Sequence, residues 1–174
     1  SMAYMRLGDL LIAAGAITQE QLEEALTIQK QKKERLGDVL IESNIITERQ
    51  LIEALQMQLG VDFIDLTAIS IPLELAKFVP RAIAKKYNGV PVKLVKDELF
   101  VAMSDPLNFV AQEEIKAASH KRVVPMISTR RATEQAISRL YGSEGTARVI
   151  EEMKREAGSA GPDIAVSYTH LRAH

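Results

Sequence analysis

The sequence predicts an α+β protein in which an N-terminal tandem helical repeat of four helices packs on a small three-stranded α/β subdomain. Two observations lead to this prediction. Residues 6–29 and 35–58 are two copies of one helical pattern, and strand-like and helical segments alternate after residue 60. We expect a repeat subdomain at residues 4–59, an α/β subdomain at 60–142, and a linker and tail at 143–174.

The duplication can be read directly from the sequence. RLGDLLIAAGAITQEQLEEALTIQ is followed, after five residues, by RLGDVLIESNIITERQLIEALQMQ. Fourteen of the 24 aligned positions are identical. Unrelated helical segments of ordinary composition would share roughly two or three. The two copies are therefore an internal repeat.

Each copy predicts a short helix, a turn and a longer helix. In the first copy, Gly15 ends the short helix, and Thr18 opens the next one in a capping box with Gln21. In the second copy, the box runs from Thr47 to Gln50, and Asn44 replaces the glycine of the turn. Asparagine tolerates the left-handed conformation, so we expect the same turn in both copies.

A different pattern follows Gly60, which ends the last repeat helix. Residues 61–66 read as an extended segment with Phe63 and Ile64 buried, and Gly89 and Pro91 mark a later turn. The other expected elements are short helices at 72–79 and 80–87, a hairpin of strands 90–95 and 99–103, helices at 108–119 and 129–141, and a strand at 122–127.

Composition narrows the possible functions. The chain has no cysteine, a formal net charge of -1, and no apolar run long enough to span a bilayer. We therefore expect a cytoplasmic protein without thiolate chemistry or a general attraction to nucleic acid. The sequence lacks G-x-x-x-x-G-K-[ST] and any acid–base or nucleophile constellation, so we expect neither an enzyme nor a metal site in this chain.

The glycines at Gly8 and Gly37 need an explanation, because glycine early in a helix costs up to about 1 kcal/mol relative to alanine. Something must approach the backbone closely at these positions. One explanation is helix crossing, and the other is a ligand held near a helix N-terminus. Arg6 and Arg35, two positions earlier, could supply planar forked donors to such a ligand.

The doubled pattern resembles the MshEN-type cyclic di-GMP-binding domain found at the N-terminus of type IV pilus assembly and type II secretion ATPases. In the first copy the motif is met by Arg6, Leu7, Gly8, Leu11, Ile12, Gly15, Ile17, Leu22, Leu26 and Gln29. In the second it is met by Arg35, Leu36, Gly37, Leu40, Ile41, Ile45, Ile46, Leu51, Leu55 and Gln58. The departures are Ala16 and Asn44, both at turns. Later family landmarks are present as Val79-Pro80, Ala102 to Pro106 and Leu140 to Gly142.

The resemblance implies cyclic di-GMP as ligand, with no further cofactor. The implied ligand-binding residues are Arg6, Leu7, Gly8, Leu22, Leu26, Gln29, Arg35, Leu36, Gly37, Leu51, Leu55, Gln58 and Asp105. Alternative roles remain open for some of them: the leucines of the long helices also suit plain helix packing, and Asp105 could cap a helix that begins at Pro106.

The chemistry of the ligand suits this set of residues. Cyclic di-GMP has two guanines and two phosphates related by a two-fold axis, which matches a duplicated half-site. Guanine O6 and N7 accept hydrogen bonds from guanidinium or amide groups, which would give Arg6, Arg35, Gln29 and Gln58 a role. A carboxylate such as Asp105 could accept from guanine N1 and N2.

The resemblance also implies partners: an ATPase domain in cis or in trans, and an inner-membrane platform protein that would recruit the domain to the inner face of the membrane. No DNA or RNA partner is expected. The alternative function is a docking module that tethers such an ATPase without binding nucleotide. Residues 166–174 match nothing in the family, and we expect that cloning introduced part of the tail.

Overall fold

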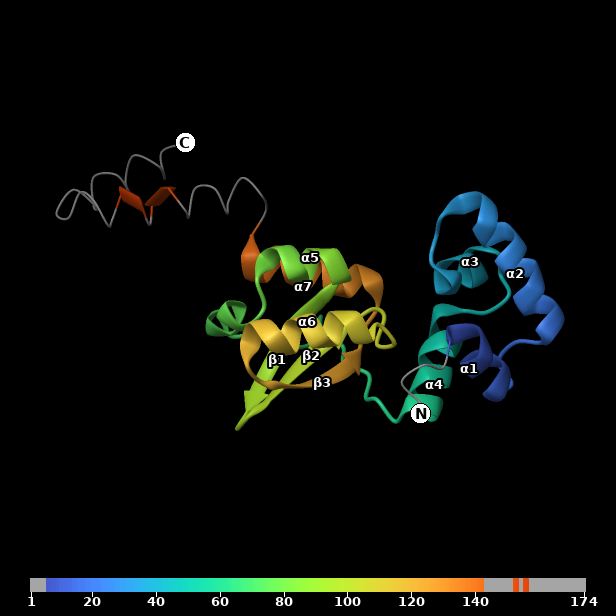
Figure 1. Cartoon of the computed structure of the whole chain (residues 1–174), viewed down its shortest axis with the longest axis horizontal. Helices are drawn as coiled ribbons and strands as arrows, with labels where there is room; N and C mark the ends of the chain where they lie inside the picture. Colours follow the sequence, from blue (N-terminus) through green and yellow to red (C-terminus); the bar gives the residue numbers. More distant parts are fainter. Residues whose placement is uncertain (1–5, 143–151, 154, 157–174) are drawn as a thin grey trace.

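The computed structural model describes residues 6–142, 152, 153, 155 and 156. A body of four helices lies beside a second body that contains a three-stranded sheet (Figure 1), so the predicted α+β fold is confirmed. Most of the predicted linker and tail, 143–174, lies outside the described residues. None of the helices in the described part is both long and apolar enough to cross a membrane.

The repeat helices follow the predicted pattern closely. They are α1 (Leu7–Ala13), α2 (Gln19–Lys32), α3 (Leu36–Glu42) and α4 (Glu48–Leu59). Gly15 and Asn44 both adopt positive φ, at 72° and 60°, which confirms that the two turns are equivalent. Both capping boxes are present: Thr18 Oγ1 and Thr47 Oγ1 each accept from the backbone N–H three residues later at 3.1 Å.

The two copies are interlaced. Helix α1 packs on α4, and α2 packs on α3, so each short helix contacts the long helix of the other copy. A single buried cluster draws on both copies, with Leu11 and Ala25 from the first and Leu40 and Ala54 from the second. Neither copy would therefore have a complete core on its own.

At Gly8 and Gly37, the lack of a Cβ atom makes room for a leucine from the long helix of the same copy. A Cβ atom on Gly8 would lie 2.7 Å from Leu22 Cδ1, and one on Gly37 would lie 3.3 Å from Leu51 Cδ2. Close helix packing thus accounts for the glycine at Gly8. At Gly37 the same packing applies, and this residue also borders a cavity described below.

The second body comprises the 3₁₀ helix η2 (Leu73–Phe78) and helices α5 (Arg81–Tyr87), α6 (Phe109–Ser119) and α7 (Arg130–Tyr141) around strands β1 (Gly89–Val95), β2 (Glu98–Met103) and β3 (Arg122–Ile127). The strand order is β1-β2-β3; β1 and β2 form the predicted antiparallel hairpin, and β2 and β3 are parallel. Helix α6 makes the crossover between the parallel strands, and α5, α6 and α7 all pack on the sheet.

Two local expectations were wrong. Gly89 and Pro91 lie inside β1, and the turn before it is made by Asn88 with a φ of 50°. Pro91 is tolerated because β1 is an edge strand with a register irregularity at this point. Phe63 is 40% exposed, because its segment runs past the end of β3 and forms only a single bridge, to Ile127.

We propose that the chain divides at Gly60, as the sequence suggests. One buried cluster lies wholly within the repeats, and a second lies wholly within the α/β body. A small third cluster joins the two bodies through Leu10, Leu55 and Ile127. Gly60 ends α4 in the left-handed conformation and begins the connecting segment.

The packing of the glycines predicts unequal costs for two matched substitutions. Gly8→Ala is expected to lower the free energy of unfolding by about 1 kcal/mol, because the buried Leu22 has little room to move away from the added methyl group and this packing cost exceeds the gain in helix propensity. Gly37→Ala should cost less, because its nearest contact is longer. Denaturant unfolding of both variants measures this difference, and equal costs would contradict the packing account.

The burial of Tyr141 predicts that the protein loses stability at alkaline pH. Its hydroxyl donates to the Val79 carbonyl oxygen at 2.6 Å, and burial raises the pKa of Tyr141 above its usual value of 10.0. Above pH 10.0, Tyr141 loses its proton in the unfolded chain but keeps it in the folded protein. The unfolded chain then binds fewer protons, so stability falls as pH rises. Tyr141→Phe should cost about 1 kcal/mol at pH 7 and make this alkaline loss smaller. Urea unfolding at pH 7 to 11 measures both effects; an identical alkaline loss in the two proteins would count against the assignment.

Candidate ligand-binding site

A cavity of about 520 Å³ lies where the second repeat copy meets the α/β body. Strands β2 and β3 are parallel, so their carboxyl ends lie at the same edge of the sheet. The segments that follow these ends, 104–107 and 128–130, form one wall of the cavity. The carboxyl ends of parallel strands are a common place for ligand sites in α/β proteins.

The opposite wall comes mainly from the second copy. Helix α3 and the residue before it contribute Arg35, Leu36, Gly37, Asp38 and Ile41, and helix α4 contributes Glu48, Leu51, Ile52 and Leu55. The first copy contributes only Arg6 and Leu7, at its N-terminus. The two copies of the repeat therefore contribute unequal numbers of residues to the cavity lining.

An apolar contact fixes the base of the cavity. Leu10 of α1, Leu55 of α4 and Ile127 at the end of β3 are buried together. Leu7, Leu51 and Leu107 pack around them and also line the cavity. This mixture of apolar surface and a few polar groups is typical of small-molecule sites.

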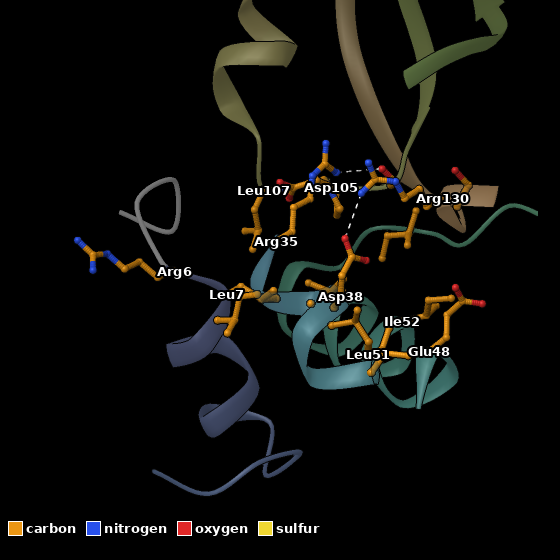
Figure 2. Close-up of a pocket in the computed structure, with 18 of the residues that line it drawn as sticks. Arg6, Leu7, Arg35, Asp38, Glu48, Leu51, Ile52, Asp105, Leu107 and Arg130 are labelled. Carbon is orange, nitrogen blue, oxygen red and sulfur yellow. Dashed lines mark hydrogen bonds and ion pairs between the residues drawn. The ribbon is translucent and has the colours of Figure 1, made fainter. Parts of the chain in front are cut away.

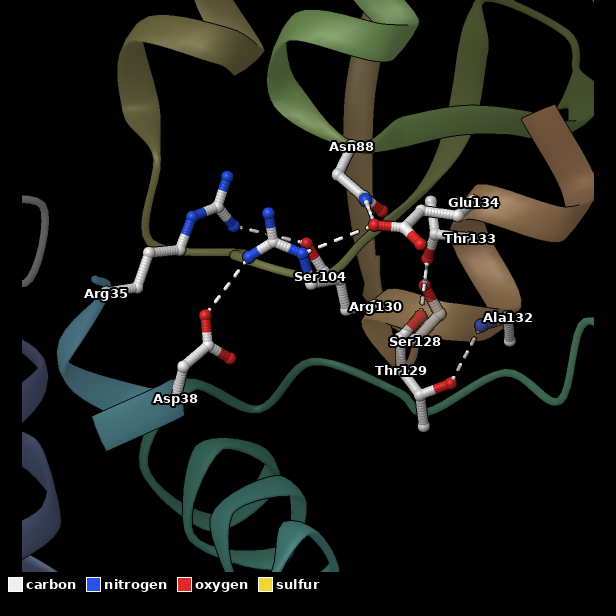
Figure 3. Close-up of polar contacts among 10 residues, drawn as sticks. All are labelled: Arg35, Asp38, Asn88, Ser104, Ser128, Thr129, Arg130, Ala132, Thr133 and Glu134. Carbon is white, nitrogen blue, oxygen red and sulfur yellow. Dashed lines mark hydrogen bonds and ion pairs between the residues drawn. The ribbon is translucent and has the colours of Figure 1, made fainter. Parts of the chain in front are cut away.

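The polar groups connect the two bodies. Arg35 Nη1 donates to Ser104 Oγ at 3.4 Å, and Arg130 Nη1 pairs with Asp38 Oδ2 at 3.0 Å. Arg130 Nε also donates to Glu134 Oε1 at 3.3 Å, one turn further along α7. Figure 3 shows these side chains reaching toward one another from α3 and α7.

Asp105 shapes the loop after β2. Its Oδ1 accepts from the Leu107 N–H at 3.1 Å, and its carbonyl oxygen accepts from the Asn108 N–H at 3.2 Å. The expectation that Asp105 could cap a helix beginning at Pro106 was wrong: α6 begins at Phe109, and its cap is Asn108, whose side chain accepts from Ala111 N–H. Asp105 instead borders the cavity in a tight turn.

Eight of the predicted ligand residues line this cavity. They are Arg6, Leu7, Arg35, Leu36, Gly37, Leu51, Leu55 and Asp105. Arg6 is exposed, and its guanidinium points away from the other labelled side chains (Figure 2), whereas Arg35 points toward the loop that contains Asp105.

The remaining five predicted residues do not line the cavity. Gly8 and Leu22 contact each other in the repeat core, and Gln29 Nε2 donates to the Glu34 carbonyl oxygen at 2.9 Å. Gln58 is half-buried near the end of α4. Leu26 is 39% exposed, whereas its counterpart Leu55 is only 4% exposed because it packs in the cluster that includes Ile127 of the α/β body.

Sequence reasoning missed three charged residues that line the cavity, Asp38, Glu48 and Arg130. The repetition of aspartate after R-L-G, as Asp9 and Asp38, was an available signal. No pattern marked Arg130, which lies 92 residues from its ion-pair partner. In the described part of the chain, no group of three or more histidine or acidic side chains could hold a metal ion.

A profile of the MshEN domain family matches residues 59–147, slightly more than half of the chain. The type IV pilus assembly ATPase PilB of Myxococcus xanthus is 31% identical over 162 residues, which are 93% of this chain and 28% of that protein. PilB of Thermus thermophilus is 26% identical over 142 residues, 80% of this chain and 16% of that protein. The chain thus spans less than a third of either relative.

Solved structures with a similar fold were also found. MshE with cdg (cyclic di-GMP) matches with a TM-score of 0.69 and 32% identity, over 79% of this chain and 99% of that chain. The N-terminal domain of XpsE matches with a TM-score of 0.65 over 80% and 96%, and at 19% identity it supports the fold alone. These matches together confirm the family resemblance, and the chain belongs to the MshEN domain family.

Proposed function

We propose that this domain binds cyclic di-GMP and regulates an ATPase of type IV pilus assembly or type II secretion in the cytoplasm. The observation that carries the proposal is the cavity in which Arg35, Leu36, Gly37, Leu51 and Leu55 of the second motif face Asp105. The similarity to MshE with cdg supports the choice of ligand. The similarity to PilB supports the ATPase as the regulated partner.

One half of the ligand would occupy this cavity. The Arg35 guanidinium can donate to guanine O6 and N7, and Asp105 can accept from N1 and N2. Within the described residues, Asp105 Oδ2 has no hydrogen-bond partner and is therefore available for this role. Leu51 and Leu55 would supply apolar surface to the flat base.

The other half would lie over the open surface of the first copy. Arg6 borders the cavity and is exposed, and Leu26 leaves more than a third of its surface uncovered. Gln29 is half-buried on the same long helix. A ligand with two-fold symmetry could thus contact both copies, with its second half more exposed than its first.

The proposal predicts one-to-one binding measured by titration calorimetry. Arg35→Ala should weaken binding about tenfold or more, because a hydrogen bond from a charged donor is lost. Arg6→Ala should weaken it too. Arg49→Ala is the matched control, since Arg49 is an exposed arginine of α4 that pairs with Glu53 outside the cavity.

A linear guanine dinucleotide should bind more weakly than cyclic di-GMP, because ring closure restrains the two bases before binding. GTP should also bind more weakly, because its single guanine can occupy only one half of the site. Circular dichroism checks that each variant is folded. If the folded wild-type chain gave no binding heat with cyclic di-GMP, the ligand proposal would fail and the docking function would remain.

A further inference from the structure

We propose that Arg130 of α7 binds a phosphodiester group of the ligand, and that Asp38 holds this guanidinium before the ligand binds. The inference rests on the cyclic di-GMP binding proposed above and assigns a role to a residue outside both repeat copies. It concerns the anionic part of the ligand, which the repeat motifs leave without a dedicated partner in the cavity.

The position of Arg130 suits an anion. It is the first residue of α7, and the preceding Thr129 fixes this helix end by accepting from the Ala132 N–H at 3.1 Å. The Arg130 side chain lines the cavity and is 47% exposed. A ligand in the cavity can therefore reach the guanidinium without unfolding any element.

The Arg130 guanidinium retains N–H groups that could donate to a ligand. Asp38 occupies Nη1 and Glu134 occupies Nε, while Nη2 has no hydrogen-bond partner in the part of the chain that the structure describes. The Asp38 carboxylate is itself 37% exposed. A pair this accessible to water is worth at most about 1 kcal/mol, so a bidentate phosphate could replace Asp38 at little cost.

Arg35 faces the same space from the opposite wall. Its contact with Ser104 Oγ is long, at 3.4 Å. Figure 3 shows its guanidinium directed, like that of Arg130, toward the region beside Ser104. An anion bound to Arg130 would reduce the mutual repulsion of the two guanidinium groups, while Arg35 stays available to the guanine.

The aspartate that follows R-L-G in both copies also supports this role of Arg130. Asp9 stands at the same motif position in the first copy, but it makes no ion pair within the described residues. The aspartate is paired only in the copy that faces α7. Exchange of Asp38 for a phosphate would therefore replace a direct contact between the two bodies with one made through the ligand.

The test measures the dissociation constant of cyclic di-GMP for Arg130→Gln in two backgrounds, wild type and Asp38→Asn. Direct phosphate contact predicts a loss of about tenfold or more in both backgrounds. If Arg130 acted only by positioning Asp38, its substitution would have no effect in the Asp38→Asn background. That result, or unchanged affinity in both backgrounds, would overturn the inference.

Two further variants serve as controls for the effect of Arg130→Gln. Arg130→Lys keeps the charge and should retain part of the affinity, because lysine binds phosphate as a point charge. Arg139→Gln, on the same helix but away from this cavity, should leave binding unchanged. A wild-type protein that bound no cyclic di-GMP would refute the proposed function itself, whereas normal binding with an unaffected Arg130→Gln variant would refute only the role of Arg130.

Discussion

The site depends on one apolar contact, in which Leu10 and Leu55 of the repeats pack against Ile127 at the end of β3. All three side chains are almost fully buried. The backbone reinforces the contact, because Ile127 N–H donates to Asp62 O at 2.8 Å and Ile127 O accepts from Ile64 N–H at 2.9 Å. This junction brings the two walls of the cavity together, and the Arg35–Ser104 and Asp38–Arg130 contacts join the same two bodies.

The α/β body makes the two repeat copies unequal. The motif residues are nearly the same, yet Leu55 is covered and Leu26 is not, and Asp38 is paired whereas Asp9 has no ion pair among the described residues. The second copy supplies most of the repeat residues that line the cavity, and the first copy supplies only Arg6 and Leu7. Under the proposed binding, a symmetric ligand would meet one half-site that is more enclosed than the other.

Features set by neighbouring residues were predicted well from the sequence. The capping boxes at Thr18 and Thr47, the turns at Gly15 and Asn44, and the strand at 122–127 all depend on local chemistry. The burial of Phe63 and the capping role considered for Asp105 were misjudged, because the first depends on where the segment passes β3 and the second on where α6 begins. The pairing of Asp38 with Arg130 joins residues from two bodies, so no local pattern could have revealed it.

A crystal structure of the chain with cyclic di-GMP is the decisive measurement for the proposed site. One guanine should lie in the cavity between Arg35 and Asp105, with the other half of the ligand over the first repeat copy. A ligand bound elsewhere, with this cavity empty and the Asp38–Arg130 pair intact, would contradict this prediction.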